Sequence, residues 1–378
     1  MAENGKTGGD AADKLIGLGL ALHSKKAAIV THDNPDPDCI AAAFGLKLLL
    51  NRHFNVSAAV FHGGLVGRAE NRCMVSQLDM DMRDISELDL RVYRTVAMVD
   101  TQPGAGNNSL PPAIIPDIVI DHHFPLRKKT RSAPFHDVRR EAGSSSTIIT
   151  EYLMEAGVKI PRKTATALLY GIRTDTYDLE REAGPEDVRA YRFLLDKTDR
   201  TLLSRIENPV HNRSYYIQLH GALESTEIYE DALITALHNV EYPEITAEIA
   251  EWFFFLRGIR WALAIGVEND SAIYLSLRAR QKKRRAGTLI RKVTGRRGTA
   301  GGHEQVAGGK IILDTPGREA AEAEIARMKK RFLRALGKDD GIPPAYLFPD
   351  KHRLSRERPP ATEQPPQPGD SNNSGKSA

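Results

Sequence analysis

The sequence of 378 residues contains only two cysteines, Cys39 and Cys73. This scarcity excludes the disulfide framework of small secreted proteins, and we expect both thiols to be reduced in a cytoplasmic protein. The chain also lacks an uninterrupted apolar run near the roughly 18 residues that cross a bilayer. No basic leader precedes its first apolar stretch, residues 15–22. We therefore expect a soluble protein with no membrane partner.

Acidic residues are missing from residues 278–297, where ten Lys or Arg occur, although the formal net charge of the whole chain is only +4. The run Lys282-Lys283-Arg284-Arg285 fits a solvated turn and a nucleic-acid contact equally well. Adjacent cations repel one another, and few aromatic side chains lie between them to stack on bases. The stretch therefore fits a short oligonucleotide or a mononucleotide bisphosphate better than a long nucleic-acid groove.

Carboxylates and imidazoles follow apolar runs at several points in the chain. These sets are His32, Asp36 and Asp38 after residues 27–30, Asp100 after 96–99, Asp121, His122 and His123 after 118–120, and Asp175 after 168–174. Taken alone, Asp38 is explained by a helix cap and Asp100 by the start of a turn. Accidental placement at every strand end is harder to accept, because open α/β sheets bind ligands outside the carboxyl ends of their strands. The pattern therefore predicts a metal site at the edge of a parallel sheet.

The types of ligand in these sets favour particular metals. Carboxylates and imidazoles suit manganese, whereas an all-thiolate set would indicate zinc. Cys39 lies next to Asp38, but small residues follow it directly, so we interpret it as a packing residue.

Alternating strands and helices predict an α/β protein with a parallel sheet. The chain exceeds the usual single-domain length, so two domains are expected. The predicted strands of the first cover residues 27–30, 56–61, 95–99 and 117–120, and the predicted helices cover 40–50, 144–155, 188–195 and 202–206. In the second, we predict a hairpin over 261–267 and 272–277, a helix over 286–293, a strand over 311–313 and an amphipathic helix over 325–336.

We divide the chain into five segments. Residues 1–10 and 351–378 have polar compositions rich in Gly or Pro that predict disorder. Residues 11–198 form the expected metal-binding domain, with helices on both faces of its sheet. Residues 199–230 form a helical linker, and residues 231–350 form a smaller α/β domain.

The order of the motifs resembles the DHH phosphoesterase superfamily. The motifs are His32-x3-Asp36-x-Asp38, an Asp after an apolar strand, Asp121-His122-His123, and Gly171-Ile172-x-Thr174-Asp175-Thr176. Residues 300–309 resemble the glycine-rich substrate motif of the associated C-terminal domain, DHHA1. The resemblance covers residues 12–345, and it looks most like the stand-alone bacterial oligoribonuclease and phosphoadenosine-phosphate phosphatases and the exopolyphosphatase-related proteins.

The resemblance implies an active site with two ions, Mn²⁺ first and Mg²⁺ or Co²⁺ as alternatives. In this arrangement Asp100 bridges the ions. The remaining ligands are His32 and Asp36 for one ion, and Asp38, His122 and Asp175 for the other. Catalytic roles fall to His123, which faces the phosphate, and to Asp121, which orients an imidazole.

Further residues are expected to bind the substrate. Arg278 and Arg280 end a predicted strand and can fork onto phosphate oxygens. Gly301 and Gly302 let the backbone approach a phosphate or base closely, and His303 can stack or donate a hydrogen bond.

Three positions depart from the usual pattern. Tyr177 stands where relatives usually have Gly, Ala300 stands where a third Gly is usual, and Phe124-Pro125 replaces an Asn after the Asp-His-His motif. None of these changes removes a metal ligand. All of them lie where a substrate could be read, so they bear on specificity.

We expect a Mn-dependent phosphohydrolase that cleaves phosphodiester or phosphomonoester bonds of short oligonucleotides or nucleotide bisphosphates. A polyphosphatase or pyrophosphatase, favoured by the basic stretch, and a cyclic-dinucleotide phosphodiesterase are alternatives. A nucleotide-binding regulator with an inactive site is disfavoured, because all proposed ligands are present. The sequence does not set the oligomeric state, and a homodimer is compatible with it.

Overall fold

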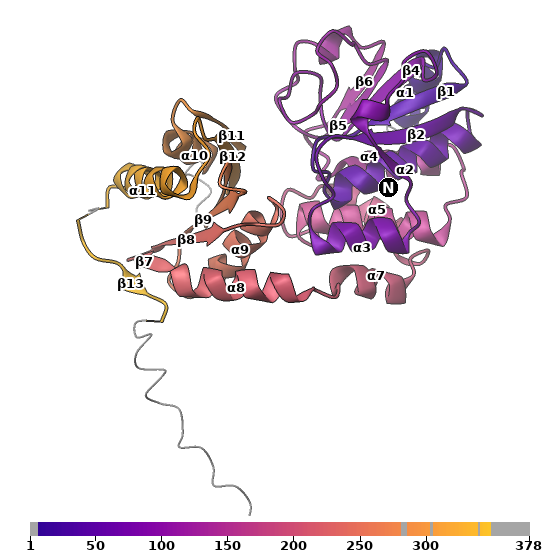
Figure 1. The fold of residues 1–378 in the computed structure, drawn as a ribbon. Helices are drawn as coiled ribbons and strands as arrows, with labels where there is room; N and C mark the ends of the chain where they lie inside the picture. Colours follow the sequence, from indigo (N-terminus) through magenta and orange to yellow (C-terminus); the bar gives the residue numbers. More distant parts are fainter. Residues whose placement is uncertain (1–6, 281–285, 303–304, 339–340, 349–378) are drawn as a thin grey trace, which may run out of the picture. The chain divides into compact units, whose positions relative to one another are not determined.

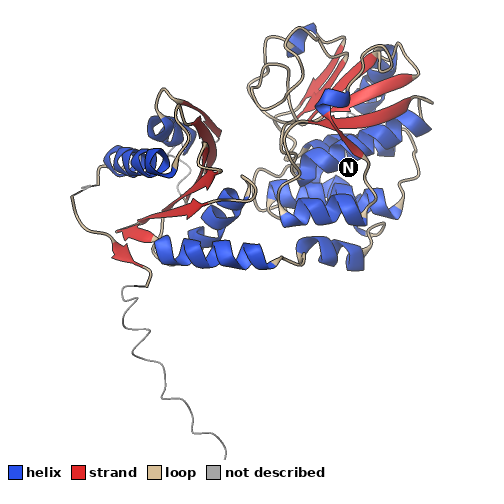
Figure 2. Cartoon of the chain, viewed as in Figure 1, coloured by secondary structure: helices blue, strands red, loops and turns tan. Residues whose placement is uncertain are grey.

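The computed structural model describes residues 7–280, 286–302, 305–338 and 341–348 (Figures 1 and 2). The chain forms two compact units, residues 1–215 with 241–245, and residues 216–240 with 246–378. No helix in the described ranges is long and apolar enough to cross a membrane.

Among the described residues, the first unit contains a six-stranded sheet in which every strand is parallel to its neighbours. In sheet order the strands are β3 (Met82–Asp84), β2 (Ser57–His62), β1 (Lys26–Val30), β4 (Thr95–Val99), β5 (Ile118–Asp121) and β6 (Phe135–Val138). The order reverses between β1 and β4, which are paired in the middle of the sheet. Such a switch point opens a crevice at the carboxyl ends of the two strands. The predicted parallel sheet is confirmed.

Seven α-helices occur in the described part of the first unit: α1 (Thr7–Leu20), α2 (Pro37–Arg52), α3 (Ala69–Gln77), α4 (Ser145–Glu155), α5 (Arg162–Thr176), α6 (Pro185–Leu195) and α7 (Arg200–Glu207). They build one core with alternate strand residues such as Ile29 and Val99. Gly45 of α2 allows close packing, because a Cβ there would lie 2.6 Å from Ile149 and 3.0 Å from Leu168.

The opposite face of this sheet is covered differently. Its strand residues, including Val30 and Met98, pack against Leu110 and Ala133 from connecting segments, and against residues near the short helices η1 (Ile85–Glu87) and η2 (Thr130–Ser132). We expected helices on both faces of the sheet. In the described part of the chain, the α-helices pack on one face, and connecting segments with short 3-10 helices cover the other, so this expectation is wrong for α-helices. The connection after β4 contains several Pro and Gly residues, which oppose helix formation.

In the described part of the second unit, a seven-stranded sheet is antiparallel except where β8 pairs with β9. In sheet order the strands are β11 (Gly298–Gly302), β12 (Val306–Ile312), β10 (Ala272–Ala279), β9 (Trp261–Glu268), β8 (Ala232–His238), β7 (Glu227–Tyr229) and β13 (Ala345–Tyr346). The predicted hairpin of β9 and β10 is confirmed. Its turn contains Asn269 and Asp270, both with positive φ.

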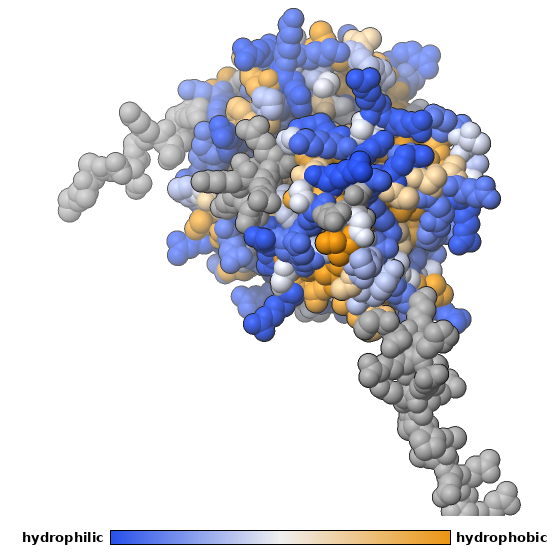
Figure 3. All heavy atoms as spheres, turned by 90° about the vertical axis from the view of Figure 1, so that its left-hand side faces the viewer, coloured by the Kyte–Doolittle hydropathy of each residue, from blue (hydrophilic) through white to orange (hydrophobic). Residues whose placement is uncertain are grey.

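The remaining helices are α8 (Arg213–Ser225), α9 (Ile245–Phe254), α10 (Ala286–Thr294) and α11 (Arg318–Ala335). The predicted apolar stripe of α11 is confirmed, because Met328 and Phe332 are buried in the core with Leu275 and Leu277 of β10. The surface drawn in Figure 3 is mostly hydrophilic, with smaller hydrophobic areas between the hydrophilic side chains.

Two segment boundaries differ from the sequence-based division. Helix α1 begins at Thr7, inside residues 1–10. Helix α7 buries Leu203 and Ile206 in the core of the first unit, so this part of the expected linker belongs to that unit. The expected disordered tail, residues 351–378, lies outside the described residues.

Candidate metal centre

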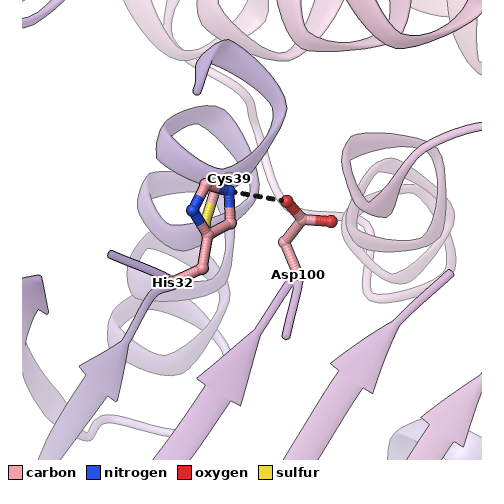
Figure 4. Close-up of side chains that lie close together, drawn as sticks. All are labelled: His32, Cys39 and Asp100. Carbon is pink, nitrogen blue, oxygen red and sulfur yellow. Dashed lines mark ion pairs between the residues drawn. The ribbon is translucent and has the colours of Figure 1, made fainter. Parts of the chain in front are cut away.

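The centre is built on the switch point between β1 and β4. His32 follows β1 and Asp100 follows β4, so both lie at the carboxyl end of the sheet (Figure 4). Nδ1 of His32 lies 2.9 Å from the carbonyl oxygen of Asp33. This leaves Nε2 facing the carboxylates, at 3.4 Å from Asp100 Oδ2 and 3.7 Å from Asp36 Oδ2. A bond at one ring nitrogen fixes the orientation of the other, as metal-binding imidazoles require.

Asp100 lies at the middle of the cluster. Its φ is +59°, a left-handed conformation that Asp tolerates better than most residues. Its side chain is 1% exposed, and its Oδ1 accepts a hydrogen bond from Ser145 Oγ at 2.9 Å. The same oxygen lies 3.4 Å from Nε2 of His122 and 3.6 Å from Nδ1 of His123.

Helix α2 supplies the next two carboxylates. Asp36 caps the helix by accepting from the backbone N–H of Cys39 at 3.0 Å, and Pro37 occupies the first helical position. Asp38 is fully buried in the first turn and accepts from the backbone N–H groups of Ser145 and Ser146 at 2.7 and 2.8 Å. These donors open α4, and a helix N-terminus stabilises a negative charge.

His122 and Asp175 complete the cluster. Nε2 of His122 lies 3.1 Å from Asp175 Oδ2, but among the described residues it is buried without a partner in hydrogen-bond geometry. Asp175 lies in the last turn of α5, so its placement after a strand was wrong. The apolar run 168–174 is a buried segment of helix, and periodicity alone does not separate this from a strand.

Asp121 orients His123 rather than His122. Its Oδ1 lies 2.9 Å from Nδ1 of His123 and accepts from the backbone N–H groups of His122 and His123 at 2.9 and 3.2 Å. Its Oδ2 accepts from Nε2 of Gln102 at 2.8 Å. Asp121 is therefore fully engaged by protein, whereas the His123 side chain is 40% exposed.

The electrostatics of the cluster show a surplus of negative charge. Burial, and then the charges of Asp100 and Asp175, raise the pKa of the Asp38 carboxyl well above its usual value. Burial alone would also raise the pKa of Asp100, but the adjacent imidazoles of His122 and His32 hold it well below its usual range. A divalent cation would relieve the repulsion between such carboxylates.

The donor set fits divalent cations. Ligand atoms of Asp38, His122 and Asp175 lie within 4.8 Å of one another, as do those of Asp100, His122 and His123. Cys39 forms a third such set with His32 and Asp100 (Figure 4). Burial raises the pKa of its thiol to about 12, and Sγ lies 3.6 Å from the carbonyl oxygen of Val99. A protonated, hydrogen-bonded thiol fits the predicted packing role better than a ligand role.

The predicted substrate residues lie in the second unit. The buried Arg278 guanidinium donates to Ser276 Oγ at 2.9 Å and to the Ala247 carbonyl at 3.4 Å, and lies 3.7 Å from Glu251. Arg280 donates to the carbonyl oxygens of Ile259, at 2.9 Å, and of Phe254. Both guanidinium groups are thus engaged by protein oxygens.

The glycine-rich segment, residues 300–309, includes the end of β11 and the start of β12. A Cβ at Gly302 would lie 2.4 Å from the Cα of Ala307, whereas one at Gly301 would meet nothing within 4 Å. Gly302 is therefore required by strand packing, and Gly301 faces open space. His303 lies outside the described residues.

Two polar residues of the centre escaped the sequence analysis. Ser145 bonds Asp100, although the Ser cluster indicated only a helix start. Gln102 bonds Asp121, and its Oε1 accepts from Arg127 N at 2.8 Å and Thr130 Oγ1 at 3.0 Å. In the sequence, only its position two residues after Asp100 indicated that Gln102 lies near the centre.

Comparison with known proteins agrees with this geometry. Residues 26–172 match the DHH family, N-terminal domain. This segment of the first unit is therefore a DHH-family domain. Its fold is similar to that of an exopolyphosphatase-related protein from Bacteroides fragilis, with a TM-score of 0.65, 16% identity, and coverage of 89% of this chain and 100% of that chain.

Curated relatives extend the comparison. An uncharacterized protein of Methanocaldococcus jannaschii is 32% identical over 311 residues, covering 81% of this chain and 62% of the relative. A probable manganese-dependent inorganic pyrophosphatase of Lactococcus lactis is 28% identical, covering 40% of this chain and 49% of the relative. A cyclic-di-AMP phosphodiesterase of Geobacillus thermodenitrificans is 24% identical, covering 69% of this chain and 42% of the relative. The chain spans less than two thirds of the length of each of these three relatives.

Proposed function

We propose that this DHH-family protein is a metal-dependent phosphohydrolase whose active site is the cluster around Asp100. The observation that carries the proposal is the convergence of carboxylates and imidazoles from four chain segments, with Nε2 of His122 buried and lacking a hydrogen-bond partner among the described residues. The relatives named as a pyrophosphatase and a cyclic-dinucleotide phosphodiesterase support phosphate chemistry.

We assign the ligands to two groups that share Asp100. The remaining ligands are His32 and Asp36 for one ion, and Asp38, His122 and Asp175 for the other. Two divalent ions held there would supply a hydroxide near neutral pH and neutralise the phosphoryl oxygens. Mn²⁺ is the proposed metal, with Mg²⁺ or Co²⁺ as alternatives, because oxygen and imidazole ligands suit these ions.

The surrounding residues orient the ligands and the substrate. Ser145 holds Asp100, and the N-terminus of α4 holds Asp38 in place. Asp121 fixes the ring of His123, whose exposed side chain can donate to an oxygen where negative charge develops. The proposed catalytic contribution of His123 is therefore binding and stabilising the phosphoryl group.

The proposed substrates are short oligonucleotides or nucleotide bisphosphates. Polyphosphate would require a wall of available cations, and two candidates for that wall, Arg278 and Arg280, donate to protein oxygens instead. Pyrophosphate and cyclic dinucleotides remain in the test panel because of the named relatives.

A metal-replacement assay tests the proposal. Protein treated with chelator and dialysed should be inactive on a panel of dinucleotides, phosphoadenosine phosphate, cyclic dinucleotides, pyrophosphate and polyphosphate. Mn²⁺ should restore hydrolysis of at least one nucleotide substrate better than Mg²⁺ or Ca²⁺, and calorimetry should detect two ions per chain. Full turnover in excess chelator, or the absence of metal binding, would contradict the proposal.

A further inference from the structure

The segment that follows Asp175 has an unusual backbone. Tyr177, Asp178 and Leu179 have consecutive positive φ values of 50°, 55° and 71°, and Glu182 has a φ of 53°. Bulky L-residues rarely adopt this left-handed conformation, because Cβ approaches the carbonyl oxygen. Strained backbone is typically found at functional sites. The segment is therefore a candidate for a role beyond ending α5.

Hydrogen bonds hold the strained turn in place. The backbone N–H of Asp178 donates to the Arg173 carbonyl at 2.9 Å, and that of Arg181 donates to the Thr176 carbonyl at 2.8 Å. Thr176 Oγ1 accepts from the backbone N–H of Leu179 at 3.0 Å. Gly or Asn would end the helix with less strain. Helix termination therefore does not account for the aromatic ring at residue 177.

The Tyr177 ring packs against a cation next to the metal centre. The ring is 42% exposed, and the Arg181 guanidinium carbon lies 4.6 Å from its centroid. Arg181 also donates from Nη2 to the carbonyl oxygen of Asp175 at 3.2 Å. Since two residues span at most about 7 Å, the Cα of Tyr177 lies close to that of Asp175.

Arg181 has unused capacity to donate. Its Nε is buried without a hydrogen-bond partner among the described residues. The nearby Asp178 carboxylate is paired with Arg173, which also contacts Glu207. Among the described residues no carboxylate forms an ion pair with Arg181, so its positive charge is not neutralised by protein, and a guanidinium binds phosphate oxygens well.

We infer that Tyr177 and Arg181 form a nucleobase subsite beside the metal centre. A purine or pyrimidine ring next to the scissile phosphate stacks on Tyr177, while Arg181 contacts a phosphate of the same nucleotide. This inference rests on the proposed function and deepens it, because it explains a preference for nucleotides over phosphates that have no base.

Binding of an uncleavable dinucleotide tests the subsite without turnover. We would titrate the full chain, loaded with Mn²⁺, with a methylene-phosphonate dinucleotide that carries 2-aminopurine, whose fluorescence falls when it stacks. Tyr177→Asn keeps a residue that tolerates positive φ but removes the ring. It should weaken binding by about 5-fold to 100-fold, the range for loss of one base stack, whereas Tyr177→Phe should bind like the wild type.

Matched controls separate stacking from backbone effects. Glu182→Asn relieves a similar left-handed conformation and should leave dinucleotide binding unchanged. Tyr177→Asn should keep its melting temperature, its metal content and its affinity for methylene diphosphonate, which has no base. Unchanged dinucleotide binding, or an equal loss for both ligands, would overturn the base subsite. Absence of hydrolysis by the metal-loaded wild type would instead count against the proposed function, and the binding data would still decide the subsite.

Discussion

The two sheets place charged side chains at strand ends in opposite ways. At the ends of β1 and β4, His32 and Asp100 face one another within a cluster that has a surplus of buried carboxylates. At the end of β10, Arg278 and Arg280 donate to hydroxyl and carbonyl oxygens of their own unit. Residue type and strand position predict function for both sites, and the neighbouring charges distinguish them. The carboxylates of the first unit repel one another, whereas both guanidinium groups donate to protein oxygens. A strand-end charge that the protein already satisfies indicates a structural role.

The largest effect expected from this comparison is at Asp100. Asp100→Asn keeps a residue that tolerates a φ of +59° but removes the charge between His32 and His122. We expect hydrolysis to fall by about three orders of magnitude or more, because neither ion retains its shared ligand. Steady-state kinetics at saturating Mn²⁺ measure the loss, and circular dichroism checks the fold. Near-normal turnover in a folded variant would reduce Asp100 to a turn residue.

Arg278 is expected to affect stability and not chemistry. Arg278→Met leaves the Ala247 carbonyl without this donor and removes the cation that lies 3.7 Å from Glu251, so the free energy of unfolding should fall by about 2–3 kcal/mol. Urea denaturation measures this change. Arg257→Gln, which removes an exposed Arg, is the control and should have little effect.

The kinetic result sharpens the comparison between the sheets. KM for a dinucleotide should stay within about two-fold of the wild type in Arg278→Met, because both Nη atoms of the Arg278 guanidinium already donate to protein oxygens. A large rise in KM at unchanged kcat would mean that Arg278 binds phosphate, as the sequence analysis expected.

The sequence predicts the features of this structure that depend on local interactions better than those that depend on tertiary packing. Apolar runs, helix caps and turn residues depend on local physics, and they locate β1, α2, β4, β5 and α4 closely. The convergence of His32, Asp100 and His122 also follows, because parallel strands end at the same edge. The helical position of Asp175 does not, because a short buried apolar run fits either kind of element.

The hydrogen-bond partners of buried polar groups are harder to predict from the sequence. The partners of Arg278 come from residues 247 and 251, which are distant in the sequence and lie on the unpredicted helix α9. The contact between Ser145 and Asp100 likewise joins α4 to the end of β4. Such contacts depend on tertiary packing, so they become visible only when the fold is known.

Substitution of Ser145 in the metal centre is expected to have an intermediate effect on Mn²⁺ affinity. Ser145→Ala removes the hydroxyl that donates to Asp100 but keeps the backbone N–H that donates to Asp38. Loss of a hydrogen bond that orients a ligand should weaken Mn²⁺ affinity by about 10-fold. Ser146→Ala is the matched control, because the Ser146 hydroxyl donates to the backbone carbonyl of Asp38 at 3.4 Å and to no carboxylate within the described ranges. Calorimetric titration that shows equal affinities in both variants would remove Ser145 from the positioning role.

The smallest effect is expected at Cys39, which lies within the same cluster but is already satisfied. Burial raises the pKa of its thiol to about 12, and the Sγ–H donates to the carbonyl oxygen of Val99 at 3.6 Å, so the thiol already has a protein partner. Cys39→Ala should therefore change Mn²⁺ affinity and kcat by less than about two-fold, and should cost about 1 kcal/mol of stability through lost packing. Calorimetry and urea denaturation measure the two quantities separately. A marked loss of Mn²⁺ affinity would make Cys39 a ligand, and it would show that a satisfied group in this cluster can still take part in metal binding.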